Sequence, residues 1–199
     1  MKALTFMRGL VTSGVSPSAV STFQEPQAMS TFDAGQAAFL RNWDYAYSNA
    51  NNPADSKVVG KVGVAPPPTF AGQPYPGYSV VGGWNLFVNP HSANVKADLT
   101  FIKWMTSPTA QTILGSKYSE IPTLQAARTA PAVMHTNPVL AILGQTKLVT
   151  RPSFTPAYQK VSQAVYTSIN QAISGSVTPK DALSTAQGQI SNALSGKGL

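Results

Sequence analysis

Residues 32–47 have the sequence FDAGQAAFLRNWDYAY, which combines a turn, a short apolar run and an aromatic segment. The apolar run, residues 37–40, is of the kind expected for a strand that is covered on both faces. Directly after it, residues 42–45 place two aromatic side chains beside an amide and a carboxylate. Open α/β sheets bind ligands beyond the carboxyl ends of their strands. The stretch predicts a buried strand that ends in a binding edge, and the alternative makes Trp43 and Tyr45 core residues of a following helix.

A second informative stretch, residues 80–88, reads VVGGWNLFV. Residues 86–88 are expected to form a strand, and Gly82 and Gly83 interrupt the apolar pattern just before it. Glycines at such a place are typical of a bulge or of a close approach between the backbone and another group. The adjacent Trp84 suggests that this group is the flat face of a ligand. A strand corner with a core tryptophan is the alternative.

The rest of the pattern is mainly helical. Helices are expected over residues 2–13, from Ser92 with Val95, Leu99, Ile102 and Met105 buried, and from Ser107 to about residue 115. Two long helices follow, one ended by Gly175 and one capped by Thr178. One more short strand is expected at residues 61–65, followed by the connector Pro66-Pro67-Pro68. A change of lobe is expected at this connector.

The composition is that of a globular chain. Of 199 residues, 43% are hydrophobic and only 11% are charged, and there is no cysteine, which excludes disulfides and thiolate metal sites. The net charge is +7, but no two basic residues are adjacent. Because a phosphate-binding surface needs clustered Lys and Arg, nucleic acid is not an expected partner. The first 14 residues lack the continuous apolar stretch of a signal peptide.

Motifs for catalysis are missing from the sequence. His91 and His135 lie in polar turns without a motif partner, and no phosphate loop, dinucleotide motif or metal-ligand spacing occurs. A glycosidase needs two facing carboxylates, for which Glu25, Asp33 and Asp44 are the candidates, but nothing in the sequence fixes their separation. Recognition without an enzyme activity, a metal or a cofactor is therefore the favoured hypothesis.

The order of the motifs resembles a known family. It runs F-x-x-G-x-A-A-F-x-x-N-W, Gly-Val-x-x-x-Pro, G-G-W-x-L-x-V, F-I-x-W-M-x-S-x-x-x-Q, I-P-T, R-P and G-x-x-T-P-x-x-A-L-x-x-A-Q. This series resembles the C-terminal half of the extracellular solute-binding proteins of ABC sugar importers, in particular the maltose- and trehalose-binding proteins. Members are longer: a signal peptide, often a lipid-carrying cysteine, and most of an N-terminal lobe precede this region.

The resemblance implies an α/β, two-lobed periplasmic-binding-protein fold of type II, incomplete here and helical in its C-terminal part. Residues 1–62 would belong to the C-terminal lobe, residues 63–123 to the N-terminal lobe, and residues 124–199 to the C-terminal lobe again. Residues 63–68 and 119–124 would be hinge crossings. Ligand would bind between lobes that close on it by a hinge motion.

The resemblance also implies a function. The chain is expected to bind a sugar or oligosaccharide outside the cytoplasm and to deliver it to an ABC permease in the membrane. Aromatic rings and hydrogen-bonding groups suit sugar rings, and the expected contacts are Trp43, Tyr45, Gly82, Gly83 and Trp84, with Asp44, Arg151 and Tyr158 as further candidates. Trp104 is expected to be a packing residue. Two alternatives stay open: a truncated interaction module that binds a polypeptide, and a carboxylate-dependent glycoside-processing enzyme.

Overall fold

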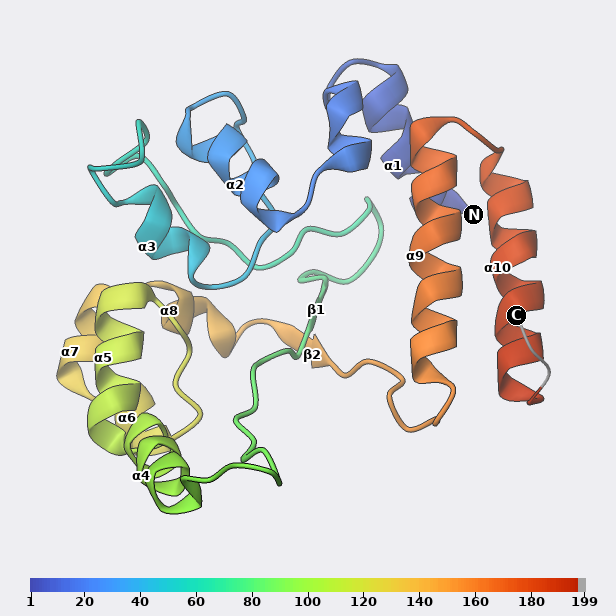
Figure 1. The fold of residues 1–199 in the computed structure, drawn as a ribbon. Helices are drawn as coiled ribbons and strands as arrows, with labels where there is room; N and C mark the ends of the chain where they lie inside the picture. Colours follow the sequence, from blue (N-terminus) through green and yellow to red (C-terminus); the bar gives the residue numbers. More distant parts are fainter. Residues whose placement is uncertain (197–199) are drawn as a thin grey trace. The chain divides into compact units, whose positions relative to one another are not determined.

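A computed structural model describes residues 1–196 (Figure 1). The chain divides into two compact units, one formed by residues 1–28 and 151–199 and the other by residues 29–150. None of the helices in the described residues is long and apolar enough to cross a membrane. The lobe boundaries expected near residues 62 and 123 remain a prediction.

The first unit is helical. Its elements are α1 (Lys2–Thr12), the 3-10 turn η1 (Ser18–Thr22), α9 (Tyr158–Ser174) and α10 (Pro179–Leu194). Helix α9 packs against both α1 and α10 (Figure 1). The core contains Leu4, Ala172 and Ala182, with partly buried Ile169, Ile173, Val177 and Leu183 packed against it. The small alanines at the contact let the helices approach closely.

The helix ends in this unit follow the sequence signals. Gly175 ends α9 in the left-handed conformation with a φ of 89°. Thr178 caps α10, because its hydroxyl accepts a hydrogen bond from the Asp181 N–H at 3.2 Å. The Arg8 guanidinium of α1 donates to the carbonyls of Ala172 and Val177 at 3.2 and 2.7 Å. A cation therefore stabilises the C-terminal end of α9.

The second unit contains short helices and one small sheet. The helices are α3 (Ala46–Ala50), α4 (Val95–Met105), α5 (Pro108–Tyr118), α6 (Gln125–Arg128), α7 (Pro131–Thr136) and α8 (Val139–Leu143). Helix α2 (Glu25–Asp33) leads into it. Ser107 caps α5 as expected, accepting from the Ala110 N–H at 3.3 Å. Helix α5 packs against α6 and α7, and Val133 is fully buried there.

A close contact of α5 depends on a glycine. A Cβ atom added at Gly115 would lie 2.8 Å from Cγ1 of Val133 and 2.9 Å from Cγ of Pro122. The Gly115 carbonyl also accepts a hydrogen bond from the buried Asn137 amide at 3.2 Å. This position therefore requires a residue without a side chain.

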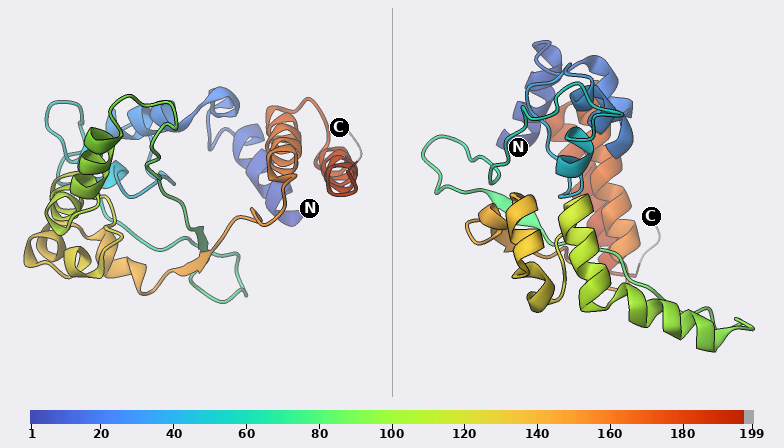
Figure 2. Two further views of the ribbon diagram at one scale, coloured as in Figure 1. Left: turned by 60° about the horizontal axis from the view of Figure 1, so that its bottom comes forward. Right: turned by 90° about the vertical axis from the view of Figure 1, so that its left-hand side faces the viewer.

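The sheet has two parallel strands, β1 (Tyr78–Val80) and β2 (Lys147–Val149), in the register Tyr78 to Lys147 and Val80 to Val149. The Val81 N–H extends the pairing by donating to the Val149 carbonyl at 2.8 Å. The sheet joins segments almost 70 positions apart in the chain (Figures 1 and 2). Neither strand was anticipated from the sequence.

The expected strands at residues 37–40, 61–65 and 86–88 are wrong. All three are extended or irregular, and Phe39 and Phe87 are 94% and 86% exposed. A strand forms only when a neighbouring strand pairs with its backbone groups. In residues 1–196 only β1 and β2 pair, so these apolar runs have no sheet to join.

The expected burial of α4 is also wrong. The helix forms, but it contains no buried residue, and Val95 and Leu99 are largely exposed. Asn94, not Ser92, is its N-cap; the Ser92 hydroxyl instead donates to the Asp98 carboxylate at 2.5 Å. Trp104, expected to pack, is 54% exposed. Within its unit, α4 extends away from the α5–α8 group, which explains the exposure (Figure 2).

Candidate binding site

Trp43 lies directly against the glycine pair in the second unit. A Cβ atom added at Gly82 would be 2.7 Å from Cη2 and 2.8 Å from Cζ3 of the Trp43 ring. The absence of a side chain at position 82 therefore lets the indole approach the backbone. The two stretches that the sequence singled out, around residues 43 and 82, meet at this contact, and Trp43 keeps 37% of its surface exposed.

Asp44 connects this aromatic segment to the linker after α5. Its Oδ2 atom accepts a hydrogen bond from the Ile121 N–H at 2.6 Å, and its Oδ1 atom accepts from the Tyr45 N–H at 3.1 Å. The Ser48 hydroxyl adds a second connection by donating to the Tyr118 carbonyl at 2.9 Å. Both carboxylate oxygens of Asp44 thus accept backbone N–H groups, an arrangement that positions residue 44 and favours a structural role over proton transfer.

Two further residues at this place were not among the sequence candidates. Burial, and then the neighbouring Asp44 carboxylate, raises the pKa of Glu120. The side-chain amide nitrogen of Asn42 is buried without a hydrogen-bond partner. An unpaired buried donor is costly and is found at functional sites. Asn42 stands in the quoted aromatic segment, but only the tertiary structure shows that its amide is unpaired.

The remaining candidates of the second unit differ in exposure. Trp84 is 98% exposed, so its ring contacts almost no other residue, and the alternative of a core tryptophan is wrong. Tyr45 is half-buried and precedes α3. Gly83 has a φ of 158°, which L side chains rarely adopt, and open space where a Cβ would be. The structure therefore brings Trp43, Asp44 and Gly82 together and leaves the Trp84 indole free to contact a ligand.

Arg151 and Tyr158 belong to the first unit. Arg151 is exposed, and Tyr158 is the first residue of α9. Their role as solute contacts stays a prediction.

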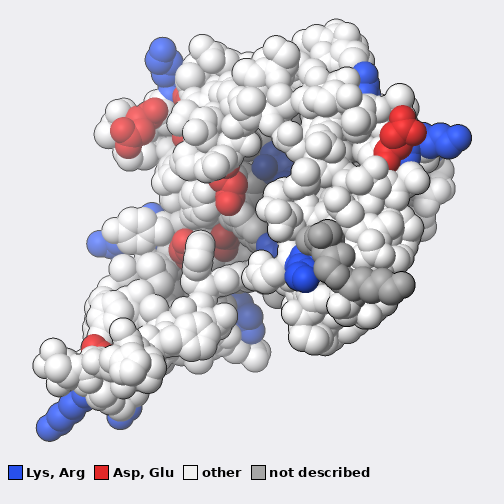
Figure 3. Space-filling view, turned by 45° about the vertical axis from the view of Figure 1, so that its right-hand side comes forward, with Lys and Arg blue, Asp and Glu red and all other residues white. Residues whose placement is uncertain are grey.

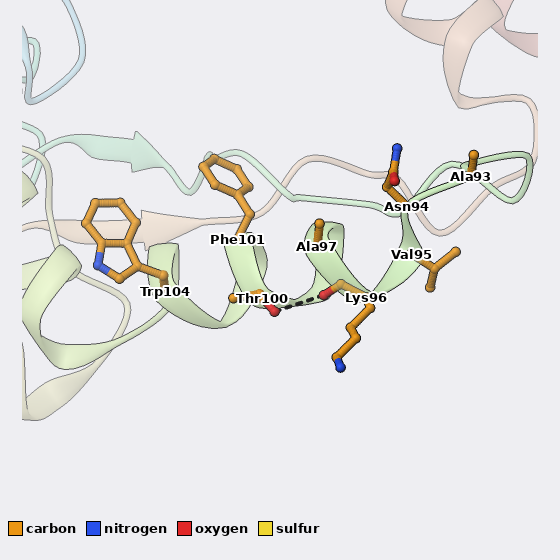
Figure 4. Close-up of a pocket in the computed structure, with 8 residues that line it drawn as sticks. All are labelled: Ala93, Asn94, Val95, Lys96, Ala97, Thr100, Phe101 and Trp104. Atoms are coloured by element: carbon orange, nitrogen blue, oxygen red, sulfur yellow. Dashed lines mark hydrogen bonds between the residues drawn. The ribbon is translucent and has the colours of Figure 1, made fainter.

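A separate open groove of about 830 Å³ runs along α4. In Figure 4 the Phe101 and Trp104 rings, one helical turn apart, point to the same side of the helix. The Thr100 hydroxyl donates to the Lys96 carbonyl at 2.9 Å and does not reach into the groove's apolar side (Figure 4). The groove is mostly apolar, and neither Trp43 nor Gly82 lines it, so it forms a second surface.

The basic side chains do not form a patch on the face shown in Figure 3. Blue groups lie scattered over this face, and some of them lie beside red acidic groups. The positive charge of the chain is thus dispersed on this face, in keeping with the spacing of Lys and Arg in the sequence.

The chain is similar in sequence to known proteins. Residues 2–112 match the family of bacterial extracellular solute-binding proteins. A probable ABC transporter-binding protein of Deinococcus radiodurans is 31% identical over 100% of this chain and 47% of its own length. A probable amino-acid ABC transporter periplasmic-binding protein, y4oP, of Sinorhizobium fredii is 26% identical over 94% of this chain and 42% of its own length.

Solved structures show the same fold. Maltose-bound MalE3 of T. maritima superposes with a TM-score of 0.80 at 29% identity, over 95% of this chain and 49% of that chain. A solute-binding protein of an ABC transporter from Agrobacterium radiobacter K84, in complex with ribitol, gives a TM-score of 0.71 at 24% identity, over 96% of this chain and 48% of that chain.

The chain spans about half the length of the relatives that it matches. Over that half, its fold is that of the periplasmic solute-binding proteins. The family match covers more than half of the chain and includes both the Trp43 segment and the glycine pair. The chain belongs to the bacterial extracellular solute-binding proteins.

Proposed function

We propose that this chain takes part in solute capture for an ABC importer and that its solute is a sugar or oligosaccharide such as maltose or trehalose. The observation that carries the proposal is the contact between Trp43 and Gly82, with the exposed Trp84 two positions further on. A flat ring beside bare backbone offers both surfaces that a sugar requires. The C–H face of a sugar packs on the aromatic ring, and the sugar hydroxyls form hydrogen bonds with backbone groups.

The neighbouring groups suit a ligand rich in hydroxyls. The unpaired Asn42 amide nitrogen is a hydrogen-bond donor. The Glu120 carboxyl lies in the same region of the fold, and burial, followed by the Asp44 carboxylate, raises its pKa. Hydroxyl groups both donate and accept, so they can pair with either. Tyr45, Gly83, Arg151 and Tyr158 remain proposed contacts. A permease in the membrane and a location outside the cytoplasm are part of the same proposal.

Two of the relatives support this ligand class. The T. maritima structure holds maltose and the A. radiobacter structure holds ribitol, and both ligands are polyhydroxylated. The name of the S. fredii relative refers to amino acids, so the experiment includes that class. Binding proteins of this family carry solutes without changing them, which favours recognition over the glycoside-processing alternative.

Tryptophan fluorescence during titration tests the proposal. The chain has three tryptophans, and Trp43 and Trp84 are the proposed contacts. We expect a saturable change with maltose or trehalose, and none with a free amino acid. Trp84→Ala is expected to weaken binding at least about tenfold while leaving the thermal transition unchanged, because the ring is exposed.

Trp104→Phe is the matched control, since Trp104 is also exposed but lies on α4. It is expected to keep the affinity of the unmodified chain. If Trp84→Ala and Trp43→Phe both bind sugar with the affinity of the unmodified chain, neither ring belongs to the site. A folded chain that responds to none of the sugars would reject sugar binding by these residues.

A second candidate function rests on α4. Its exposed Val95, Phe101 and Trp104 line the same apolar groove, a surface of the kind that proteins use to bind other polypeptides. This favours the interaction-module alternative if sugar binding fails. Sedimentation that depends on protein concentration, and that Phe101→Ser abolishes, would support it.

A further inference from the structure

A cavity of about 410 Å³ lies between the end of α2 and the loop that follows α3, and no residue of the proposed solute site lines it. Its polar lining includes Asp33, Asp55, Asn49 and Ser30. All of these lie within the unit formed by residues 29–150. The sequence assigns Asp33 and Asp55 ordinary turn roles, and the solute site uses neither.

Asp33 is the unusual member of this lining. It is 7% exposed, and its Oδ1 atom is buried with no hydrogen-bond partner. A carboxylate oxygen buried in this way is costly unless a donor, a water molecule or a cation pairs with it. The Asp33 carboxylate therefore favours a positive group beside it, and the cavity has room for one.

The backbone adds to this demand for positive charge. Asp33 is the last residue of α2, and the last turn of that helix contains no basic residue. The C-terminal end of a helix carries partial negative charge and favours cations. A carboxylate at this position, with a second one nearby, makes the cavity more negative still.

We propose that this cavity binds a hard divalent cation, Ca²⁺ in preference to Mg²⁺, through the carboxylates of Asp33 and Asp55 and the amide oxygen of Asn49. Hard cations prefer oxygen ligands, and Ca²⁺ accepts six to eight of them in irregular geometry, water included. The Asn49 amide nitrogen donates to the Met29 sulfur at 3.3 Å, which leaves its oxygen for the ion. The Ser30 hydroxyl is a further oxygen in the lining.

The second carboxylate is held by a turn. One Asp55 oxygen, Oδ2, accepts from the Asn52 amide at 2.7 Å, and the other remains for coordination. The Lys57 N–H donates to the Asp33 carbonyl at 2.8 Å, so the loop is fixed to the end of α2. Residues 1–196 contain no group of three His, Cys, Asp or Glu side chains suited to a metal. The proposed set has only two carboxylates and completes its coordination with neutral oxygens and water.

Lys57 offers a competing source of positive charge, because its side chain also lines the cavity and could pair with Asp33 itself. Its side chain is exposed, and its flexible stem allows the ammonium to leave when an ion enters. The two possibilities make opposite predictions for Lys57→Met. If a metal ion is the partner of the Asp33 carboxylate, removal of the lysine should strengthen cation binding. If Lys57 is the partner, the variant should bind no cation.

Isothermal titration of the chelator-treated chain with CaCl₂ and MgCl₂ tests the proposal. We expect one Ca²⁺ per chain, weaker binding of Mg²⁺, and a Ca²⁺-dependent rise in the thermal transition temperature. Asp33→Asn and Asp55→Asn should each weaken Ca²⁺ binding by about tenfold or more. Lys57→Met should strengthen it several-fold. Because Asp55 is exposed, its variant tests the site without altering a buried residue.

Glu25→Gln is the matched control, since Glu25 lies on the same helix in its first turn and outside the cavity. It should bind Ca²⁺ as the unmodified chain does. No heat and no thermal shift with millimolar Ca²⁺ would overturn the proposal, as would full Ca²⁺ affinity in Asp55→Asn. The outcome is independent of sugar binding, because none of these residues belongs to the proposed solute site.

Discussion

The Trp43 ring lies so close to Gly82 that a Cβ atom at position 82 would be 2.7 Å from Cη2 of the indole. One segment follows α2 and the other follows β1, and 38 residues separate them. Backbone and ring can touch there only because position 82 has no side chain. The contact covers part of the indole, and Trp43 keeps 37% of its surface exposed.

Gly82→Ala should displace the Trp43 ring. Because Trp43 is partly exposed, its ring can move, and we expect a loss of less than about 1 kcal/mol in the free energy of unfolding. The emission of Trp43, measured in a Trp84→Phe and Trp104→Phe background, should shift to longer wavelength. Gly63→Ala, where a Cβ meets open space and the backbone suits an L residue, is the comparison. An unshifted Gly82→Ala spectrum would contradict the contact.

Gly115→Ala should destabilise the second unit far more. The added methyl group would press on Val133, which is fully buried, and on Pro122, so neither neighbour can give way easily. Overpacking of this kind costs about 1–3 kcal/mol. Chemical denaturation measures the change. Gly188→Ala in α10 is the matched control: nothing lies within 4 Å of its Cβ position, so it should gain about 0.5–1 kcal/mol from helix propensity.

Arg8→Met should loosen the contact between α1 and the end of α9. The substitution removes the hydrogen bonds to the carbonyls of Ala172 and Val177 but keeps much of the apolar stem. Loss of hydrogen bonds from a charged donor costs about 1.5–3 kcal/mol. Hydrogen exchange should show faster opening of residues 172–177. Lys160→Met, exposed near the start of α9, should leave that exchange unchanged.

Burial, and then the Asp55 carboxylate, raises the pKa of Asp33. This shift predicts a pH dependence of stability in the absence of divalent cations. An acid whose pKa is higher in the folded chain binds more protons there than in the unfolded chain, so stability falls as pH rises through the ordinary aspartate range. Asp33→Asn removes this loss. In chelator, the variant should therefore be more stable than the unmodified chain at pH 7, with the advantage vanishing at strongly acidic pH. Thermal melts across pH measure it, and an advantage that persists in acid would refute the assignment to Asp33.

The sequence alone predicted the helices whose boundaries depend on local chemistry. Gly175 ends α9 because glycine accepts a positive φ, and Ser107 and Thr178 cap α5 and α10 through their own hydroxyls. The order of motifs also pointed to the solute-binding family, which the comparisons show. The aromatic and glycine segments were singled out by composition, without knowledge that they touch.

Only the tertiary structure decided which apolar runs are buried and which are strands. Phe39 and Phe87 belong to runs that read as strands, yet they are exposed, because a strand requires a partner and local sequence does not supply one. The pairing of Tyr78–Val80 with Lys147–Val149 joins distant segments by backbone hydrogen bonds, which side-chain patterns do not encode. The Trp43 and Gly82 contact, and the unpaired oxygen of Asp33, likewise arise from residues that meet only after folding.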